Sequence, residues 1–173
     1  MRRALIALLG GTVAACQREG RAESERPSPS THQRMDRYEW LASNSAPAGT
    51  PMRITAGAFL FPGGDSIYIP PRTLHSGWGS RVSTHLVGPD AKPLPNRVRI
   101  TFYSFLEDTF YAGDFSLPHE RIAQLFADGF PSDAEPSGRD TYSAIVAGVA
   151  PGGAVAVWLS GSERQVEVFF GEA

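Results

Sequence analysis

Cys16, the only cysteine of the chain, is the residue whose surroundings best suit a chemical reaction. Two arginines, an apolar run from Ala4 to Val13 and the small pair Ala14-Ala15 precede it. A basic start, a short apolar middle and a small-residue cleavage site are the parts of a secretory signal. The pattern therefore predicts export of the chain and cleavage beside this thiol.

A cysteine at the cleavage point resembles a bacterial lipoprotein signal. The resemblance implies that residues 1–15 are removed, that the Cys16 thiol receives a diacylglycerol, and that the new amino terminus is acylated. Each buried methylene contributes about 0.8 kcal/mol to membrane attachment, so this lipid anchor would hold firmly. Gln17, in place of an aspartate, favours an outer membrane lipoprotein facing the periplasm. An ordinary signal cut near a cysteine is the alternative.

The other residues that could do chemistry form no catalytic or metal-binding pattern. The histidines are scattered, without the close spacing that metal ligation needs. Ser80, near His75 and His85, lacks both a G-x-S-x-G motif and an acid partner. The sequence therefore predicts no enzyme, no catalytic residue, no cofactor and no metal site, with an envelope hydrolase as the weaker alternative. The remaining histidines are His32 and His119.

Three carboxylates gather around one predicted hairpin: Glu107, Asp108 and Asp114. Two nearby carboxylates can exchange protons with a substrate or hold calcium. Turns also favour aspartate, because its side chain hydrogen-bonds to the local backbone. We prefer the second interpretation, in which the three have structural roles.

A Pro- and Gly-rich loop over residues 70–80 is the candidate binding site, with Arg72, His75 and Trp78 as its candidate residues. Tryptophan and arginine are enriched among binding hot spots, and functional residues gather on loops held by a rigid scaffold. The alternative is that Trp78 folds back over the core.

Composition divides the chain into a tether and the folded domain that must position these residues. The chain holds 16 Lys and Arg against 18 Asp and Glu, so there is no basic excess to suggest nucleic acid. Residues 16–37 are charged and almost free of apolar side chains, which predicts a disordered tether behind the lipidated Cys16. Residues 38–173 predict one β-rich domain, at about 130 residues enough for a single core.

Short apolar runs between turns predict antiparallel strands. Residues 53–60 and 66–69 form one expected hairpin, and residues 97–105 and 109–111 another. Residues 142–149 fit a strand better than a helix, and strands over 154–159 and 165–169 follow. The expected fold is α+β and mostly antiparallel: a meandering sheet of about seven to nine short strands with one packed helix.

That helix begins after a possible cap at Ser116, with Pro118 in its first turn, and ends at Gly129. Its apolar face is expected to hold four side chains: Ile122, Leu125, Phe126 and Phe130. Trp158, inside the strand at 154–159, is expected in the core.

An ordered series of short motifs carries a family resemblance. The series is Gly77-Trp78-Gly79, Pro93-Leu94-Pro95, Thr101-Phe102-Tyr103-Ser104, Phe110-Tyr111-Ala112-Gly113-Asp114-Phe115 with Leu117-Pro118, Ala150-Pro151-Gly152-Gly153 and Val157-Trp158-Leu159-Ser160-Gly161. From about Trp40 to Phe169 the chain resembles a family of bacterial lipoproteins catalogued as domain of unknown function twenty-nine thirty-one. The resemblance implies location and fold better than activity. Some members occur beside lipase effectors of the type VI secretion system, which implies an immunity role.

Three functions remain open. The first is a membrane-anchored envelope lipoprotein, of unknown specific role, that acts as a non-catalytic protein-binding module. Its narrower form is an immunity protein that neutralises a secreted lipase effector. The second is an envelope enzyme, which no motif of the sequence supports. The third is a small-ligand carrier or structural envelope component, which would need a large apolar cavity in the sheet.

Overall fold

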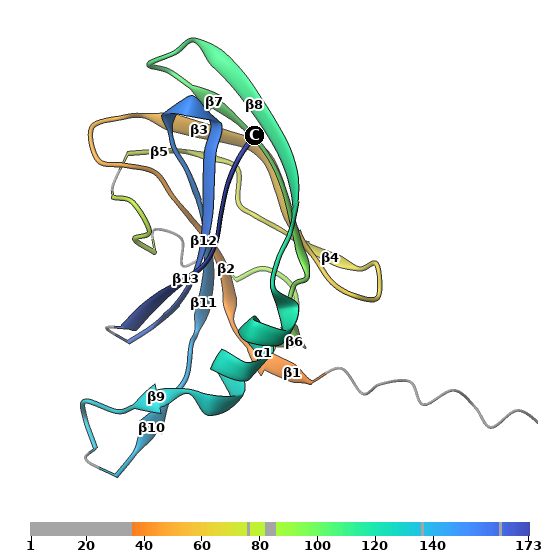
Figure 1. Cartoon of the computed structure of the whole chain (residues 1–173), viewed down its shortest axis with the longest axis vertical. Coiled ribbons are helices and arrows are strands. Elements are labelled where there is room, and N and C mark those ends of the chain that lie inside the picture. Colours follow the sequence, from red (N-terminus) through yellow and green to blue (C-terminus); the bar gives the residue numbers. More distant parts are fainter. Residues whose placement is uncertain (1–35, 76, 82–85, 136, 163) are drawn as a thin grey trace, which may run out of the picture. The chain divides into compact units, whose positions relative to one another are not determined.

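The computed structural model describes residues 36–75, 77–81, 86–135, 137–162 and 164–173 (Figure 1). Its contacts separate the segment Met1–Arg34 from the folded unit Met35–Ala173. Cys16, His32, His85 and nearly all of the predicted tether lie outside the described residues. In the described part, no helix is long and apolar enough to cross a membrane.

The larger sheet has five antiparallel strands, and the strand β7 (Arg97–Ser104) shows why they form. Every second residue of β7 is buried and those between are exposed or partly exposed, the period-two pattern of a sheet with one covered face. Both predicted hairpins occur here, as β3 with β4 and as β7 with β8. The strands in spatial order are β4 (Ser66–Tyr68), β3 (Met52–Leu60), β7 (Arg97–Ser104) and β8 (Thr109–Ser116), and β5 (Arg72–Leu74) also pairs with β3.

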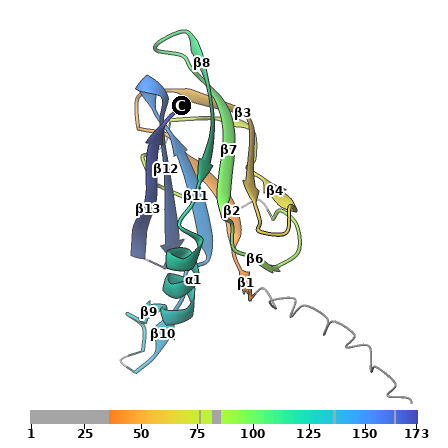
Figure 2. The same cartoon turned by 45° about the vertical axis from the view of Figure 1, so that its right-hand side comes forward.

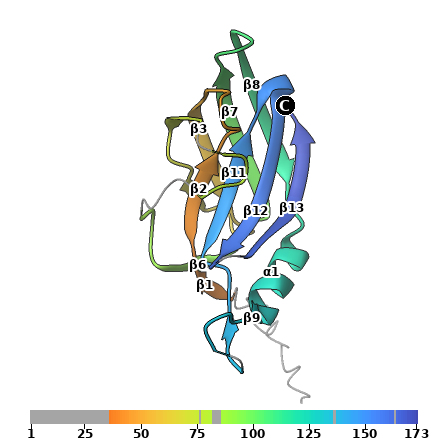
Figure 3. The same ribbon diagram turned by 90° about the vertical axis from the view of Figure 1, so that its left-hand side faces the viewer.

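The second sheet has four strands, which Figure 3 shows face-on. The segment predicted to be a strand over residues 142–149 is strand β11, and every one of its residues is buried. β11 lies antiparallel to β12 and parallel to β2, which is about one hundred residues away in sequence. The strands in order are β13 (Arg164–Glu172), β12 (Ala154–Gly161), β11 (Ala144–Val149) and β2 (Leu41–Ser45).

The two larger sheets pack face to face (Figure 2). The core between them contains Phe59 and Phe102 from the five-stranded sheet and Val157 and Leu159 from the four-stranded sheet. These side chains are fully buried, and burial of each contributes about 1.5–3 kcal/mol. Packing between the sheets is therefore the main source of stability.

Two short sheets complete the β-structure. They are β1 (Arg37–Glu39) with β6 (Ala91–Pro93), and β9 (Phe130–Pro131) with β10 (Arg139–Asp140). Mostly antiparallel strands with one helix among the described residues confirm the predicted α+β class. The described residues form thirteen strands in four sheets, where the sequence indicated one sheet of about seven to nine, because short pairs such as β1 with β6 and β9 with β10 carry no local signal and no strand pairing joins the two larger sheets.

The helix α1 spans His119–Asp128, and its beginning differs from the prediction. Ser116 does not cap it, because this residue is paired with Arg97 in the sheet and has extended backbone. Pro118 occupies the cap position, without a side-chain hydrogen bond. Gly129, with a φ of 58°, ends the helix as predicted.

The apolar face of α1 is also shorter than predicted. Ile122 and Phe126 are buried, and Leu125 is partly buried and packs against the core, as predicted. The Phe126 ring contacts the rings of Tyr38 and Tyr142. Phe130 belongs to β9, where its ring packs against Tyr142. The turn at Gly129 separates Phe130 from the helix.

Candidate functional site

The loop predicted to bind a partner crosses the outer face of the four-stranded sheet. At one edge, the Gly77 N–H donates to the Ala46 carbonyl at 2.9 Å, next to β2. The Gly79 N–H donates to Ser45 Oγ at 3.1 Å, and the Gly79 carbonyl accepts from the Gln165 amide on β13. We call the described residues 77–81 the strap, because they are held at both edges of the sheet.

Trp78 is the side chain that the strap places on the sheet. Its ring meets the Trp158 ring edge-on, with centroids 4.9 Å apart and an angle of 85° between the planes. Trp158 is buried in a small cluster with Val146 and Ala156, on the sheet face opposite the main core. Trp78 remains partly exposed but has a clear packing role. Its placement matches the alternative in which it folds back over apolar residues.

The other candidate residues of this loop do not join Trp78. Arg72 lies on β5 and His75 directly follows that strand, and both are exposed. Within the described residues, the side chains of Arg72 and His75 make no hydrogen bond, ion pair or ring contact. A binding role for the three residues together stays a prediction.

The described histidines and carboxylates do not form a reactive cluster. His119, at the start of α1, lies with Nδ1 3.3 Å from the Pro95 carbonyl oxygen, far along the chain from His75. Over the described ranges, no three His, Cys, Asp or Glu side chains are arranged to hold a metal ion. Ser80, in the strap, is exposed.

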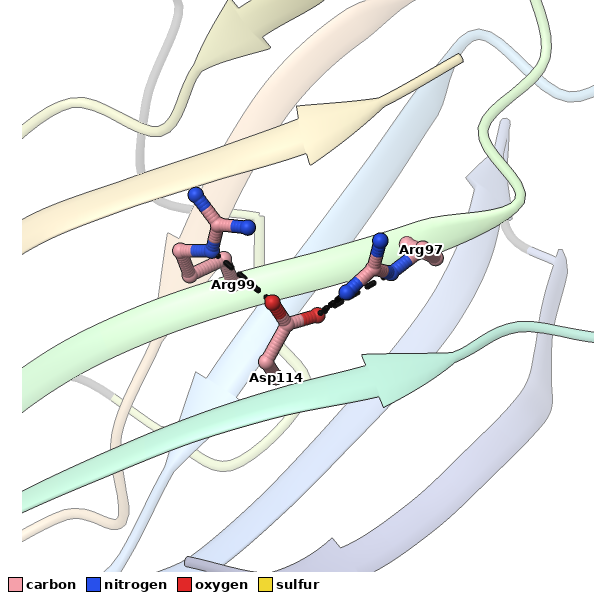
Figure 4. A network of polar contacts seen from close by, with 3 residues as sticks. All are labelled: Arg97, Arg99 and Asp114. Carbon is pink, nitrogen blue, oxygen red and sulfur yellow. Dashed lines mark hydrogen bonds and ion pairs between the residues drawn. The ribbon is translucent and has the colours of Figure 1, made fainter. Parts of the chain in front are cut away.

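Asp114 lies between two arginines on the outer face of the five-stranded sheet (Figure 4). One carboxylate oxygen is 2.8 Å from Arg97 Nη2, and the other is 2.9 Å from Arg99 Nε. The hydrogen bond from Arg99, followed by that from Arg97, lowers the pKa of Asp114. The carboxylate is therefore held as the anion by its own neighbours, which suits a structural role.

Glu107 and Asp108 fix the turn between β7 and β8. The Gly152 N–H donates to Glu107 Oε1 at 2.9 Å, which ties this turn to the turn before β12. Asp108 has a φ of 52°, a left-handed conformation that aspartate tolerates better than most residues. Its carboxylate accepts a hydrogen bond from the Tyr103 hydroxyl. Each of the three carboxylates thus has a local partner, as the structural interpretation expects.

The same turn carries an apolar surface that the sequence analysis missed. Leu106 is 71% exposed, Phe110 is 66% exposed and Phe105 is about half exposed. The Tyr103 ring links the two phenylalanines, with its centroid 5.0 Å from that of Phe105 and 4.8 Å from that of Phe110. We call Tyr103, Phe105, Leu106 and Phe110 the hairpin tip. The signal was present in the sequence, because Tyr103 and Phe105 occupy the outward positions of an alternating strand.

Lys92, the only lysine of the chain, is a second residue whose environment was not predicted. It is 2% exposed, and its ammonium donates to the carbonyls of Trp40 and Asp90 and lies 5.2 Å from the Trp40 ring centroid. Burial lowers its pKa, partly offset by the charge of Asp90. The Lys92 stem borders an open surface hollow of about 560 Å³ that Arg37 and Asp65 also line. Its hydrogen bonds join the chain around Trp40 to β6.

Comparison with known protein families gives a match. The sequence model of the family described as "Protein of unknown function (DUF2931)" matches residues 26–172, which is most of the chain. No curated protein and no solved structure matches the chain.

Proposed function

The chain belongs to the DUF2931 family of proteins of unknown function, and on this premise we propose that it is a membrane-anchored bacterial envelope lipoprotein that binds another protein and performs no catalysis. The pattern around Cys16 supports the anchor. The observation that supports binding is the exposed hairpin tip. A contiguous group of exposed apolar side chains on a folded domain is typical of an interaction site.

The tip is suited to binding because it is already ordered. Glu107 and Asp108 hold its turn through Gly152 and the Tyr103 hydroxyl, so little conformational freedom remains to be lost. Binding energy is gained most efficiently by aromatic and aliphatic side chains on a rigid support. Phe105 and Leu106 would enter a pocket on the partner.

A protein partner fits the tip better than a bilayer does. Glu107 and Asp108 directly follow the apolar pair Phe105-Leu106, so deep insertion into lipid would carry two carboxylates with it. The tip also lies at the end of the folded unit remote from β1, where the described chain begins (Figure 1). An eight-residue strand such as β7 is about 27 Å long, so within the folded unit the tip is set well apart from β1.

The interior between the two larger sheets is filled by side chains such as Phe59, Phe102 and Leu159. A small-ligand carrier would need an apolar cavity there, so we do not propose that role. An immunity protein against a secreted lipase is the narrower form of the binding proposal, and the identity of the partner tests it.

The experiment compares two leucines of nearly equal exposure, Leu106 at 71% and Leu86 at 72%. The tagged full-length chain is expressed in its own cells, solubilised in detergent and captured, and the bound proteins are quantified by mass spectrometry. We expect Leu106→Ser to reduce one specific partner by about tenfold or more, while Leu86→Ser leaves it unchanged. A lipase as that partner would support the immunity role. Equal capture by both variants would refute binding through the tip.

A further inference from the structure

The outer faces of the two larger sheets differ in how they are covered. The strap covers the outer face of the four-stranded sheet, where Trp78 lies on Trp158. On the five-stranded sheet, no element among the described residues covers the outer face. Cross-strand pairs share a face, so the register Tyr68–Ala58–Arg99–Asp114 defines one row of that open surface.

An apolar strip runs across this face from the hairpin tip. Tyr103 and Phe110 are paired outward residues of β7 and β8, and both belong to the tip. The next outward row contains Ala112 and Ala56 on either side of Thr101, and Ala58 and Tyr68 follow. We call the surface from Tyr103 and Phe110 to Tyr68 the strip.

The strip is hollowed because its middle positions carry small side chains. Ala56, Ala58 and Thr101 help to line a depression of about 220 Å³, whose wall includes Arg99. A solvent-facing strand position ordinarily holds a long polar side chain, and here two of them hold alanine. The depression has room for a side chain from another molecule.

The charge around the strip is positive. Arg97 and Arg99 share the single carboxylate of Asp114, which leaves one positive charge in excess. Arg53, paired with Tyr103 in the register, adds another, and no described residue forms an ion pair or hydrogen bond with its side chain. The Asp108 carboxylate, which accepts from the Tyr103 hydroxyl, offsets one of these charges, so the face keeps one positive charge in excess. A ligand for this surface should therefore carry carboxylates.

We propose that the strip binds an acidic segment of the partner protein, with an apolar side chain of that segment seated in the hollow and carboxylates paired with Arg53 and Arg99. This inference rests on the proposed function, because it assigns the chemistry of the partner that the hairpin tip engages. The tip provides the apolar anchor, and the strip selects for acidic partners through electrostatic complementarity.

The test places a photo-reactive phenylalanine analogue at Leu106 or at Tyr68, the exposed aromatic residue paired with Ala58 beside the hollow, in the full-length chain, in its own cells. Adducts are quantified, and the attached partner segment is identified by mass spectrometry. The variants are Arg53→Glu and, as a matched control, Arg164→Glu on β13, since both arginines are exposed and neither side chain has a polar partner among the described residues. Arg53→Lys tests whether charge alone suffices.

We expect one partner at both positions, attached through a segment rich in Asp and Glu. Arg53→Glu should reduce the adduct about tenfold, while Arg164→Glu and Arg53→Lys leave most of it. Two results would overturn the proposal for the strip and leave binding through the hairpin tip intact. One is a protein adduct at Leu106 whose yield Arg53→Glu does not change, and the other is an adduct on a partner segment without carboxylates. Adducts to lipid, or none to protein at either position, would overturn both proposals.

Discussion

The indole ring of Trp78 meets that of Trp158 edge-on, 4.9 Å between centroids, across the outer face of the four-stranded sheet. Trp158 in turn lies over Gly148, where an added Cβ would overlap its ring. Gly148, Trp158 and Trp78 thus lie one above the other, outward from the sheet. This arrangement makes Trp78 a stabilising residue of the fold.

Replacing Trp78 with alanine should therefore lower the free energy of unfolding by about 2 kcal/mol, because an edge-on aromatic pair and apolar burial are lost together. Guanidinium denaturation of the lipid-free protein measures this change. Leu86→Ala serves as the control and should stay within about 0.5 kcal/mol of the parent. If Trp78→Ala is as stable as the parent, the strap tryptophan does not contribute to the fold.

Gly148→Ala should destabilise the same stack from below. The new methyl group would displace the Trp158 ring, and overpacking of this kind lowers stability by about 1–3 kcal/mol. Thermal unfolding followed by tryptophan fluorescence reports both the stability and the position of the ring. The comparison is Gly49→Ala, where a Cβ has open space but the positive φ of 78° also introduces strain. A Gly148→Ala variant with unchanged emission and unfolding temperature would contradict the stack.

Asp114 gives the stability a defined pH dependence. Its pKa is lowered in the folded state, so the folded protein binds that proton less readily than the unfolded chain. The stabilising contribution is present above the unfolded-state value of about 3.9 and is lost as the pH falls through the lower folded-state pKa. Carboxyl NMR should show Asp114 titrating below a normal aspartate, and Asp114→Asn should make stability less dependent on pH below about 4. Titration of Asp114 at or above the normal value would contradict the ion pairs.

Lys92→Met should lower the free energy of unfolding by about 1–2 kcal/mol. Methionine keeps most of the apolar stem over Trp40, but the carbonyls of Trp40 and Asp90 lose a donor. Denaturant unfolding measures the loss, and Lys92→Ala, which also removes the stem, should be worse. Stabilisation by methionine would instead show that desolvation of the ammonium outweighs its hydrogen bonds.

The parts of the fold that sequence could predict are those decided by local chemistry. The hairpin of β3 and β4 follows from its Gly- and Asp-containing turn. Pro followed by Gly suits the central positions of a type II turn, and Gly152, after Pro151, has the φ of 75° and ψ of 14° that such a turn requires. The parallel pairing of β2 with β11 has no local signal, because it depends on contact between segments about one hundred residues apart. Ser116 resembles a helix cap in sequence, but its place in β8 decides its backbone.

The candidate site was harder to predict for the same reason. A Gly- and Pro-rich loop with a tryptophan looks the same in sequence whether it is free or fastened, and only Ser45 and Gln165, from distant strands, show that this loop is fastened. The hairpin tip could have been found from the sequence, because Tyr103 and Phe105 are two residues apart and so share the outward face of the predicted strand over residues 97–105. The strip could not, since it requires the register of four strands.

The burial of Lys92 has a practical consequence for any search for the partner. Because it is the only lysine of the chain and is almost fully enclosed, the folded domain presents no lysine side chain to amine-directed reagents. Succinimidyl ester cross-linkers and biotinylating agents would leave its surface unlabelled, and a complex fixed by such chemistry would be missed. The same enclosure makes Lys92 an internal reporter, since its labelling would mark molecules that have opened.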